Sequence, residues 1–338
     1  MRKPPTMPEY PLQIRHKLSW KVLAESLEGT FQQMIQREVA KETDLTGAAL
    51  PGADMARLKL RQARLAGAEL TDADLTGTDL PGATLTEADL RRVKLGRASL
   101  SGADLTEANL TSANLQMANG VEVNFRATRL TAAKFDGANL PRANFGRAVL
   151  TRTGFEKAKL DGASFCRASF AGTRFNGASL ITADLRHIKA RGVVLSGANM
   201  TEAHAARANF SACAMQGVNL TRTELYYADL RNAQLQGARL DGTILQGADL
   251  RGANLTGAII AENVDFSDCN LEGAILENIR LLTEDGHVVE GCRVGVAGKV
   301  ERPDSSAPDS SADEQDKPFG PPKADRRRVR RALALPRL

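Results

Sequence analysis

The side chains best suited to catalysis or metal binding are four histidines and four cysteines, and their spacing argues against both roles. The histidines are His16, His187, His204 and His287, and the cysteines are Cys166, Cys213, Cys269 and Cys292. No histidine has a Cys, His or Glu partner at metal-ligand spacing. The cysteines are too scattered for a metal cluster or a disulfide framework. Because the sequence also lacks a P-loop and a dinucleotide-binding fingerprint, we expect no enzyme activity, no cofactor and no metal.

Charge is the remaining signal for binding, since the basic residues are concentrated in the middle of the chain. The whole chain carries a net charge of +5. Residues 45–125 hold 8 basic and 10 acidic residues, residues 126–191 hold 13 and 4, and residues 192–281 hold 6 and 10. The net charges of the three segments are therefore −2, +9 and −4. The middle segment is either a solvated face of like charges or a surface that faces an anion.

A strict period of five residues positions these charges. From Leu45 to Ile260, every fifth residue is Leu, Ile, Met or Phe at 41 of 44 positions. The residue two places earlier is small, usually Ala, and the residue just before is often Asp or Asn. Such a short internal period indicates a repeat architecture.

A period of five fits neither a helix nor a flat strand. On a helix, apolar residues five apart would be spread around all sides, because successive residues turn by about 100°. On a strand they would alternate between the two faces. The pattern is satisfied only if the chain turns a corner in every repeat, with Gly, Asn, Asp, Ser and Thr suited to the corners. We therefore predict an all-β solenoid whose coils stack through parallel ladders.

The repeats carry a family resemblance. Residues 73–77 (Ala-Asp-Leu-Thr-Gly) and 248–252 (Ala-Asp-Leu-Arg-Gly) resemble the A-(D/N)-L-X-X unit of the pentapeptide-repeat family. The resemblance covers residues 44–282. It implies a right-handed quadrilateral β-helix with four repeats in each coil, and hence about twelve coils.

With four repeats in a coil, residues twenty apart stack. We then expect one ladder of Phe125, Phe145 and Phe165, and another ladder on the opposite side. That second ladder is formed by Phe135, Phe155 and Phe175. Leucines fill the two remaining sides, so the ladders are interpreted as core packing. Cys213 falls on a small inward position and is interpreted as a core residue.

The same stacking places four basic residues in one outward column. They are Arg147, Arg167, His187 and Arg207, in line with Glu87 and Glu107 further toward the N-terminus. A second basic cluster near the C-terminus contains Arg326, Arg327, Arg328, Arg330 and Arg331. These nine basic residues are the candidate anion-binding residues.

Three positions interrupt the apolar series, and its phase shifts once. At Ala190 the lost volume is compensated by Ile188, whereas Gly120 and Ala205 are expected to be local bulges. After Ile260 the series resumes at Phe266, which predicts a one-residue insertion near 261–265.

The ends of the chain differ from the repeat. In residues 1–43 we expect strands at 12–16 and 20–24 and a helix with Thr30 as N-cap that extends to about Glu42. Its apolar face would cap the first coil, an arrangement similar to the start of bacterial and phage-encoded pentapeptide-repeat proteins. We expect residues 283–300 to form a closing hairpin with an Asp-Gly turn. Residues 301–338 are rich in Pro, Ser and Asp, and we expect a disordered tail that ends in the basic cluster.

Three functions remain open. The first is a non-enzymatic rod that binds a protein or acts as a scaffold. The second is association with nucleic acid or another anionic surface through the basic column and the arginines at 326–331. The third, implied by the resemblance, is a DNA mimic that modulates a type II topoisomerase, which the basic centre of the rod disfavours. The sequence contains no apolar run long enough to span a membrane and no signal core at its start, and the free cysteines suggest a reducing cytoplasm.

Overall fold

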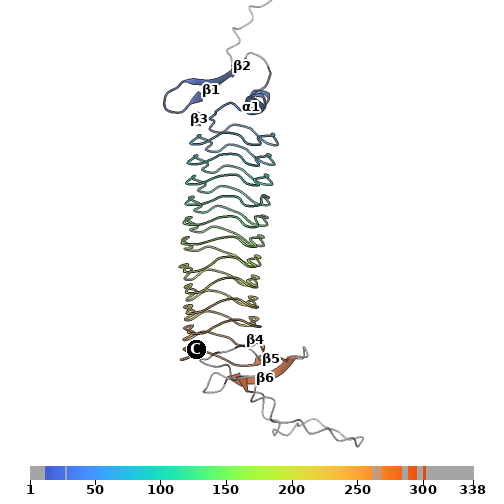
Figure 1. Cartoon of the computed structure of the whole chain (residues 1–338), viewed down its shortest axis with the longest axis vertical. Helices are drawn as coiled ribbons and strands as arrows, with labels where there is room; N and C mark the ends of the chain where they lie inside the picture. The colour runs from blue at the N-terminus through green and yellow to red at the C-terminus, as the bar shows by residue number, and fades with distance from the viewer. Residues whose placement is uncertain are drawn as a thin grey trace, which may run out of the picture. The chain divides into compact units, whose positions relative to one another are not determined.

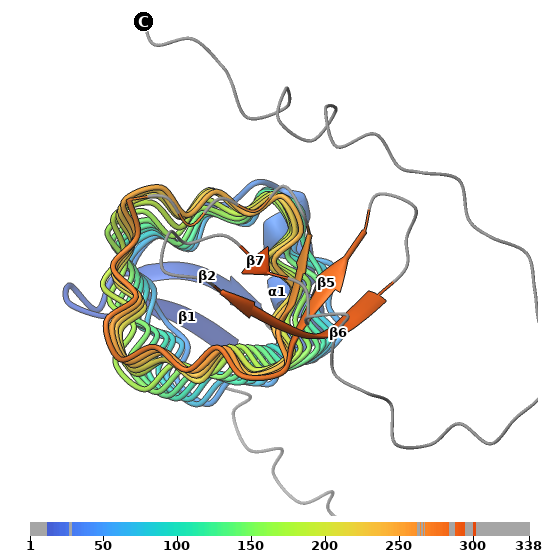
Figure 2. The same ribbon diagram turned by 90° about the horizontal axis from the view of Figure 1, so that it is seen from below.

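The repeat folds as a stack of coils. The computed structural model describes residues 12–26, 29–261, 264, 266, 268–283, 288–294 and 300–301, which all belong to one compact unit. Parallel bridges join residues twenty apart, from Asp44↔Arg64 to Arg239↔Ile259. Four repeats of five residues therefore make one coil, as the family resemblance implies. Figure 1 shows the coils stacked above one another, and Figure 2 shows their four-sided outline. The prediction of a solenoid is confirmed, whereas its right hand and the count of about twelve coils stay predictions.

The backbone hydrogen bonds of the wall run between neighbouring coils. Leu60 donates its N–H to the carbonyl oxygen of Asp79 at 2.7 Å, and Asp79 donates in turn to Leu58 at 2.9 Å. Since each wall contributes only one bridging residue per coil, the walls are ladders of single bridges rather than long strands. The parallel register is thus set by the inward side chains and the corners.

Each corner is a tight turn. Ala68 donates its N–H to the carbonyl oxygen of Leu65 at 3.1 Å, and Gly67, the second of the two residues between them, has a φ of +60°. The residue before each apolar position often stabilises the corner that follows: Oδ1 of Asp74 accepts the N–H of Thr76 at 2.9 Å. The recurrent Asp and Asn of the repeat are therefore turn-forming residues.

The core is a continuous column of inward side chains. The large apolar residues of the series and the small residues two places before them are buried along the stack. Where the small residue is Thr, its hydroxyl donates to a carbonyl oxygen of the previous coil, as Thr78 does to Met55 at 2.9 Å. Cys213 occupies the same place, and its thiol lies 2.9 Å from the carbonyl oxygen of Ala190.

The two phenylalanine ladders are as predicted, and they also touch each other. Phe125 and Phe145 stack with ring centroids 4.9 Å apart, and Phe135 and Phe155 stack at 4.8 Å. Across the interior, Phe145 and Phe155 meet edge to face at 5.4 Å. Edge-to-face pairs are favoured by the ring quadrupoles, so the two ladders interlock in the middle coils.

The expected bulges at Gly120 and Ala205 are wrong. Gly120 donates to Asn139 at 2.9 Å and Ala205 donates to Glu224 at 2.9 Å, in unbroken register. At Gly120 a neighbour takes up the space, because Cγ2 of Val123 lies 2.6 Å from the place of an added Cβ. The small inward residue of the next repeat thus fills the position of the missing side chain.

The N-terminal segment forms a hairpin and a helix. Strand β1 (Leu12–His16) pairs antiparallel with β2 (Val22–Ser26) and, on its other side, with β3 (Ala48–Ala49) of the first coil. The second strand begins two residues later than predicted. The reason is that Trp20, with a φ of +58°, still belongs to the turn and donates its N–H to the carbonyl oxygen of His16.

Helix α1 spans Phe31–Ala40 and begins as predicted, with a capping box. The hydroxyl of Thr30 accepts the N–H of Gln33 at 3.2 Å, and the side chain of Gln33 accepts the N–H of Thr30 at 2.8 Å. Met34 and Ile35 are fully buried, so the predicted apolar face packs inward. The helix ends before Glu42, whose φ of +58° is incompatible with its continuation.

The last coil leads into a small sheet. Beyond Ile260 the register changes to 21 residues, as in Asp249↔Asn270, which confirms the one-residue insertion. Strand β4 (Ile259–Ala261) pairs parallel with β5 (Ile279–Leu282), which pairs antiparallel with β6 (Val288–Val294). Strand β7 (Val300–Glu301), not predicted, pairs antiparallel with β6. The Asp-Gly turn at 285–286 and the tail after 301 lie outside the described residues. No helix in the part of the chain that the structure describes could span a bilayer.

Candidate anion-binding surface

The predicted basic column lies on one corner of the coils. Arg147, Arg167, His187 and Arg207 each occupy the second corner position, with φ between +57° and +61°. Their backbones stack directly: Arg147 donates its N–H to the carbonyl oxygen of Cys166 at 2.9 Å, and Arg207 donates to Tyr226 at 2.8 Å. The structure therefore brings these four residues together on consecutive coils. The other five candidates, Arg326, Arg327, Arg328, Arg330 and Arg331, lie outside the described residues.

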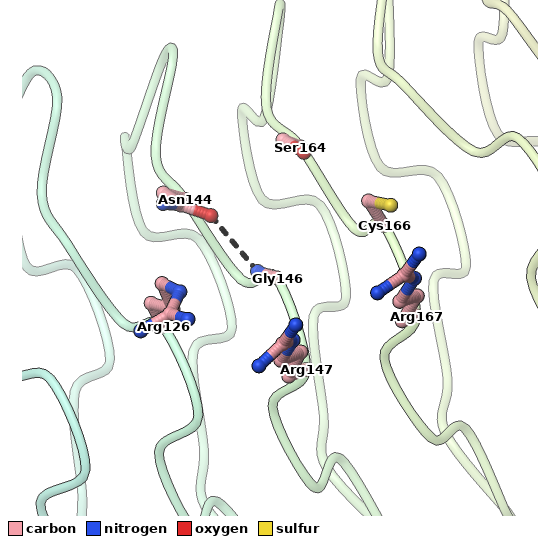
Figure 3. A pocket seen from close by; sticks show the side chains of 7 residues that line it. All are labelled: Arg126, Asn144, Gly146, Arg147, Ser164, Cys166 and Arg167. Carbon is pink, nitrogen blue, oxygen red and sulfur yellow. Dashed lines mark hydrogen bonds between the residues drawn. The ribbon is translucent and has the colours of Figure 1, made fainter.

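A hollow opens beside the first two residues of the column. It has a volume of about 270 Å³, and its lining consists of Arg126, Asn144, Gly146, Arg147, Ser164, Cys166 and Arg167. Figure 3 shows the three arginines on successive coils, one coil apart. Gly146 lies between Arg126 and Cys166 in the stack and leaves the space that a side chain would fill.

A side-chain hydrogen bond holds the backbone that lines the hollow. Oδ1 of Asn144 accepts the N–H of Gly146 at 2.9 Å, which fixes the corner between the arginines. The Cys166 side chain is exposed. Three guanidinium groups around a hollow with a hydroxyl and an amide at its edge form a donor-rich surface, which is the chemistry that binds oxyanions.

The sequence identified two of the three arginines of the hollow and missed Arg126. The missed signal was available, because Arg126, Gly146 and Cys166 are spaced by twenty at the first corner position. A glycine between larger residues in one column marks a depression in the wall. The basic column alone does not reveal this depression. The depression lies between the basic column, at the second corner position, and the neighbouring stack of residues at the first corner position.

The C-terminal end of the column differs from the hollow. The guanidinium carbon of Arg207 lies 5.8 Å from the ring centroid of Tyr227, the next residue of the stack. Such a cation–π contact gives Arg207 a partner within the chain. The column therefore divides into the two arginines of the hollow and one arginine that stacks on an aromatic ring, with His187 between them.

Ion pairing separates the middle segment from its neighbours. Among the 13 basic residues at 126–191, only Arg142, Arg174 and Arg186 have a carboxylate within 4.0 Å in the described structure. Ten basic residues of that segment are therefore without a described ion pair. At 45–125, five of eight basic residues are paired, and at 192–281 four of six. The charge excess of the middle segment is not neutralised by the wall itself.

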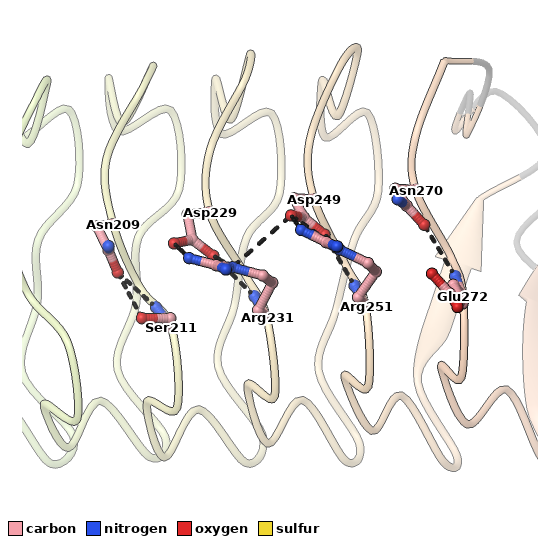
Figure 4. Close-up of polar contacts among 8 residues, drawn as sticks. All are labelled: Asn209, Ser211, Asp229, Arg231, Asp249, Arg251, Asn270 and Glu272. Carbon is pink, nitrogen blue, oxygen red and sulfur yellow. Dashed lines mark hydrogen bonds and ion pairs between the residues drawn. The ribbon is translucent and has the colours of Figure 1, made fainter.

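The segment at 192–281 has a different polar surface (Figure 4). Asp229 accepts the backbone N–H and the guanidinium of Arg231, and Asp249 does the same with Arg251. Nε of Arg231 also lies 3.7 Å from Asp249 of the next coil. The Arg231 guanidinium lowers the pKa of the Asp229 carboxyl, and Arg251 lowers the pKa of Asp249. These acids are occupied by their own arginines and do not form a free acidic surface.

The described His, Cys, Asp and Glu residues do not cluster as a metal centre would require. No group of three or more His, Cys, Asp and Glu among them could hold a metal ion. His204 pairs instead with Glu224, with Nδ1 2.9 Å from the carboxylate oxygen. Burial raises the pKa of the Cys213 thiol to about 12, which makes it an unreactive core residue.

Comparisons with known proteins agree with this architecture. A family model described as pentapeptide repeats matches in 8 copies at residues 41–77, 53–92, 68–106, 148–186, 178–211, 206–242 and 233–278. A second model, the pentapeptide repeat region, matches residues 88–165. A search of curated proteins gave no match.

Several solved structures are similar to the chain. HetL, a pentapeptide repeat protein involved in heterocyst differentiation regulation in the cyanobacterium Nostoc sp. strain PCC 7120, is 28% identical over 76% of this chain and 98% of its own, with a TM-score of 0.25. A trypsin-treated variant of QnrB1, a plasmid-mediated fluoroquinolone resistance protein, is 21% identical over 53% of this chain and 90% of its own, with a TM-score of 0.40. Since the first family model alone matches more than half of the 338 residues, this chain belongs to the pentapeptide repeat family.

Proposed function

We propose that the chain acts without catalysis, as a right-handed rod of about twelve coils that binds another protein along its side. The inward side chains are used for the core, so the outward residues and the corners are left to select a partner. Residues 1–43 would cap the first coil. We place this function in a bacterial cytoplasm, on the resemblance and on the free cysteines.

The main observation behind this proposal is that ten of the 13 basic residues at 126–191 have no carboxylate partner in the described structure. Like charges on neighbouring coils repel, and an acidic partner relieves that repulsion. We therefore infer a partner with an acidic surface. It contacts the corner that carries Arg147 and Arg167 and the hollow at Gly146.

Association with nucleic acid or another polyanion is the second candidate. Its support is the regular column, since Arg147 and Arg167 are one coil apart, about 4.8 Å. The five arginines at 326–331 would add to such a surface. Binding of this kind depends on counterion release and weakens steeply with salt.

A DNA mimic that modulates a type II topoisomerase is the third candidate, and the charges disfavour it. Mimicry needs a negative surface, but the centre of the rod has a net charge of +9. The segment at 192–281 has a net charge of −4, and Asp229 and Asp249 there are held by Arg231 and Arg251. We expect the purified protein not to inhibit supercoiling by gyrase. Dose-dependent inhibition that persists at high salt would reverse this ranking.

A capture experiment separates the first two candidates. The immobilised full chain is incubated with nuclease-treated and untreated bacterial lysates, at low and at high salt. Proteins retained at high salt after nuclease treatment support the protein-binding rod. Nucleic acid that is recovered only at low salt supports the second candidate.

A matched pair of triple variants locates the surface. The column variant carries Arg147→Glu, Arg167→Glu and Arg207→Glu, and the control variant carries Arg152→Glu, Lys157→Glu and Lys159→Glu. Both change the net charge by the same amount within a few coils. Loss of the captured partner only in the column variant supports the proposed surface. Equal loss in both variants would show that only the total charge matters.

A further inference from the structure

The turn of the N-terminal hairpin exposes two large apolar side chains. We call residues 17–21 the hairpin tip; their sequence is Lys-Leu-Ser-Trp-Lys. Leu18 is 79% exposed and Trp20 is 68% exposed, the two highest values among the large apolar residues of the described structure. Other exposed apolar residues are partly covered, as Met117 and Tyr227 lie against glycines of the next coil. The tip is therefore the most prominent apolar feature of the described surface.

The backbone of the tip is braced in this conformation. Nδ1 of His16 accepts the N–H of Leu18 at 3.3 Å and the N–H of Ser19 at 3.1 Å. Nη1 of Arg15 donates to the carbonyl oxygen of Trp20 at 3.0 Å. The N–H of Lys17 donates to Gly47 of the first coil at 2.8 Å, which ties the tip to the solenoid. The two apolar side chains are thus presented by a preorganised turn.

Trp20 is held at an energetic cost. Its φ of +58° lies in the left-handed region, which is unfavourable for a bulky aromatic residue. Glycine or asparagine would suit this position better for folding alone. Strain of this kind persists where the surrounding structure enforces it, as it also does at the corners of the coils, where Arg147 and Tyr227 have similar φ values.

The tip is surrounded by positive charge. Arg15, Lys17 and Lys21 flank the two apolar residues, and the one carboxylate of the described hairpin, Glu25, lies opposite Gln13 and away from the turn. In the described structure Arg15 reaches Glu25 only through the side chain of Gln13, and no ion pair is seen for any of the three cations. The surface therefore combines an apolar projection with unneutralised cations.

We propose that the hairpin tip docks on an anionic lipid surface. A projection of two side chains needs either a partner with a matching pocket or a partner that deforms around it. The interface of a bilayer deforms, and its phosphates complement Arg15, Lys17 and Lys21. Tryptophan favours the level of the headgroups because its ring is apolar and its N–H is polar. This inference is independent of the partner proposed for the basic corner.

The chain carries its own reporter for this contact, because Trp20 is its only tryptophan. The full chain is titrated with vesicles of phosphatidylcholine and phosphatidylglycerol, and with vesicles of phosphatidylcholine alone. We expect the emission of Trp20 to shift to shorter wavelength and its quenching by acrylamide to decrease with the anionic vesicles. Added salt should reverse the shift. Inorganic phosphate at the same phosphate concentration should leave the spectrum unchanged, because it offers no apolar interface.

Variants of the tip test its two components. Leu18→Ser keeps the reporter and should weaken vesicle binding about tenfold by removing apolar contact. Lys17→Glu combined with Lys21→Glu should weaken it by at least about tenfold. The controls Tyr227→Ser and Lys59→Glu change an exposed ring and an exposed cation away from the tip and should bind like the wild type. All the changed residues are on the surface, so melting curves should show intact folds.

The outcomes are distinct. If the protein sediments with the vesicles but the emission of Trp20 does not change, another surface binds the lipid and the proposal is wrong. The absence of binding would also overturn it. An emission shift with a purified protein partner, but with no vesicle, would assign the tip to protein recognition instead.

Discussion

The ring of Tyr227 lies over Gly247, the residue twenty positions later on the same corner. A Cβ added to Gly247 would collide with the ring atoms Cδ1 and Cε1 of Tyr227. The guanidinium carbon of Arg207, on the preceding coil, lies 5.8 Å from the centroid of the same ring. An exposed aromatic side chain is thus held between the backbone of one coil and an arginine of another.

Gly247→Ala should therefore destabilise the protein more than alanine at a corner with free space. Gly237 has a similar φ, +66° against +70° for Gly247, and no atom within 4 Å of an added Cβ. We expect Gly237→Ala to cost about 1 kcal/mol through backbone strain alone. Gly247→Ala should cost about 1 kcal/mol more, because the ring must swing away and loses Arg207. The two alanine variants should become equal in a Tyr227→Ala background, as measured by urea unfolding; a persistent difference would contradict this account.

The phase of the repeat can be tested at two adjacent residues. Leu150 is fully buried, whereas Val149 is 38% exposed on the outside of the same wall. Leu150→Lys places an unpaired charge inside the stack and should cost several kcal/mol, about 4 or more. Val149→Lys should change the stability by about 0.5 kcal/mol or less. Thermal melting of both variants checks this, and similar melting temperatures would mean that the series does not point inward.

The N-terminal segment should protect the open end of the stack. Arg15↔Ala49 and His16↔Ala48 pair β1 with the first coil, so removal of residues 1–43 exposes that backbone edge. We expect the truncated protein to associate end to end, because an unpaired edge is a template for pairing. Light scattering after gel filtration measures the mass. A monomer as stable as the full chain would show that the segment is an independent appendage.

The Asp–Arg pairs predict a loss of stability in acid. Arg231 and Arg251 lower the folded-state pKa values of Asp229 and Asp249 below the ordinary value of 3.8. A carboxyl with a lowered folded pKa stabilises the fold above its unfolded value and loses that contribution as the pH falls through the folded value. The decline should extend from about pH 5 to below pH 3.

Matched variants isolate this effect. The double variant Asp229→Asn with Asp249→Asn should flatten the acid limb of a plot of unfolding free energy against pH. Asn254 occupies the same position of the repeat as Asp229 and Asp249, but on another wall. Its side chain accepts the N–H of Thr256 and does not titrate. Asn254→Ala should lower stability equally at every pH. An unchanged acid limb in the double variant would show that other carboxyls determine it.

Much of the architecture was determined by the sequence alone. The five-residue period required a corner in every repeat, and the apolar phase identified the buried residues, because inward and outward positions alternate within each wall. The capping box at Thr30 is a local pattern, and so is the phase shift after Ile260. Both depend on neighbours in the sequence, which is why they were predictable.

The tertiary structure decided what depends on neighbouring coils. Val123 fills the space at Gly120, so the chain has no bulge there, and this compensation depends on the next repeat. Arg126 joins Arg147 and Arg167 at the hollow because Gly146 leaves room on the coil between them. The exposure of Trp20 could not be predicted from the sequence, because the pattern at 20–24 predicted that a strand begins at this residue. The conformation of Trp20 depends instead on the hydrogen bonds that His16, Arg15 and Gly47 make with the turn. A strained turn forms only where the surrounding structure holds it.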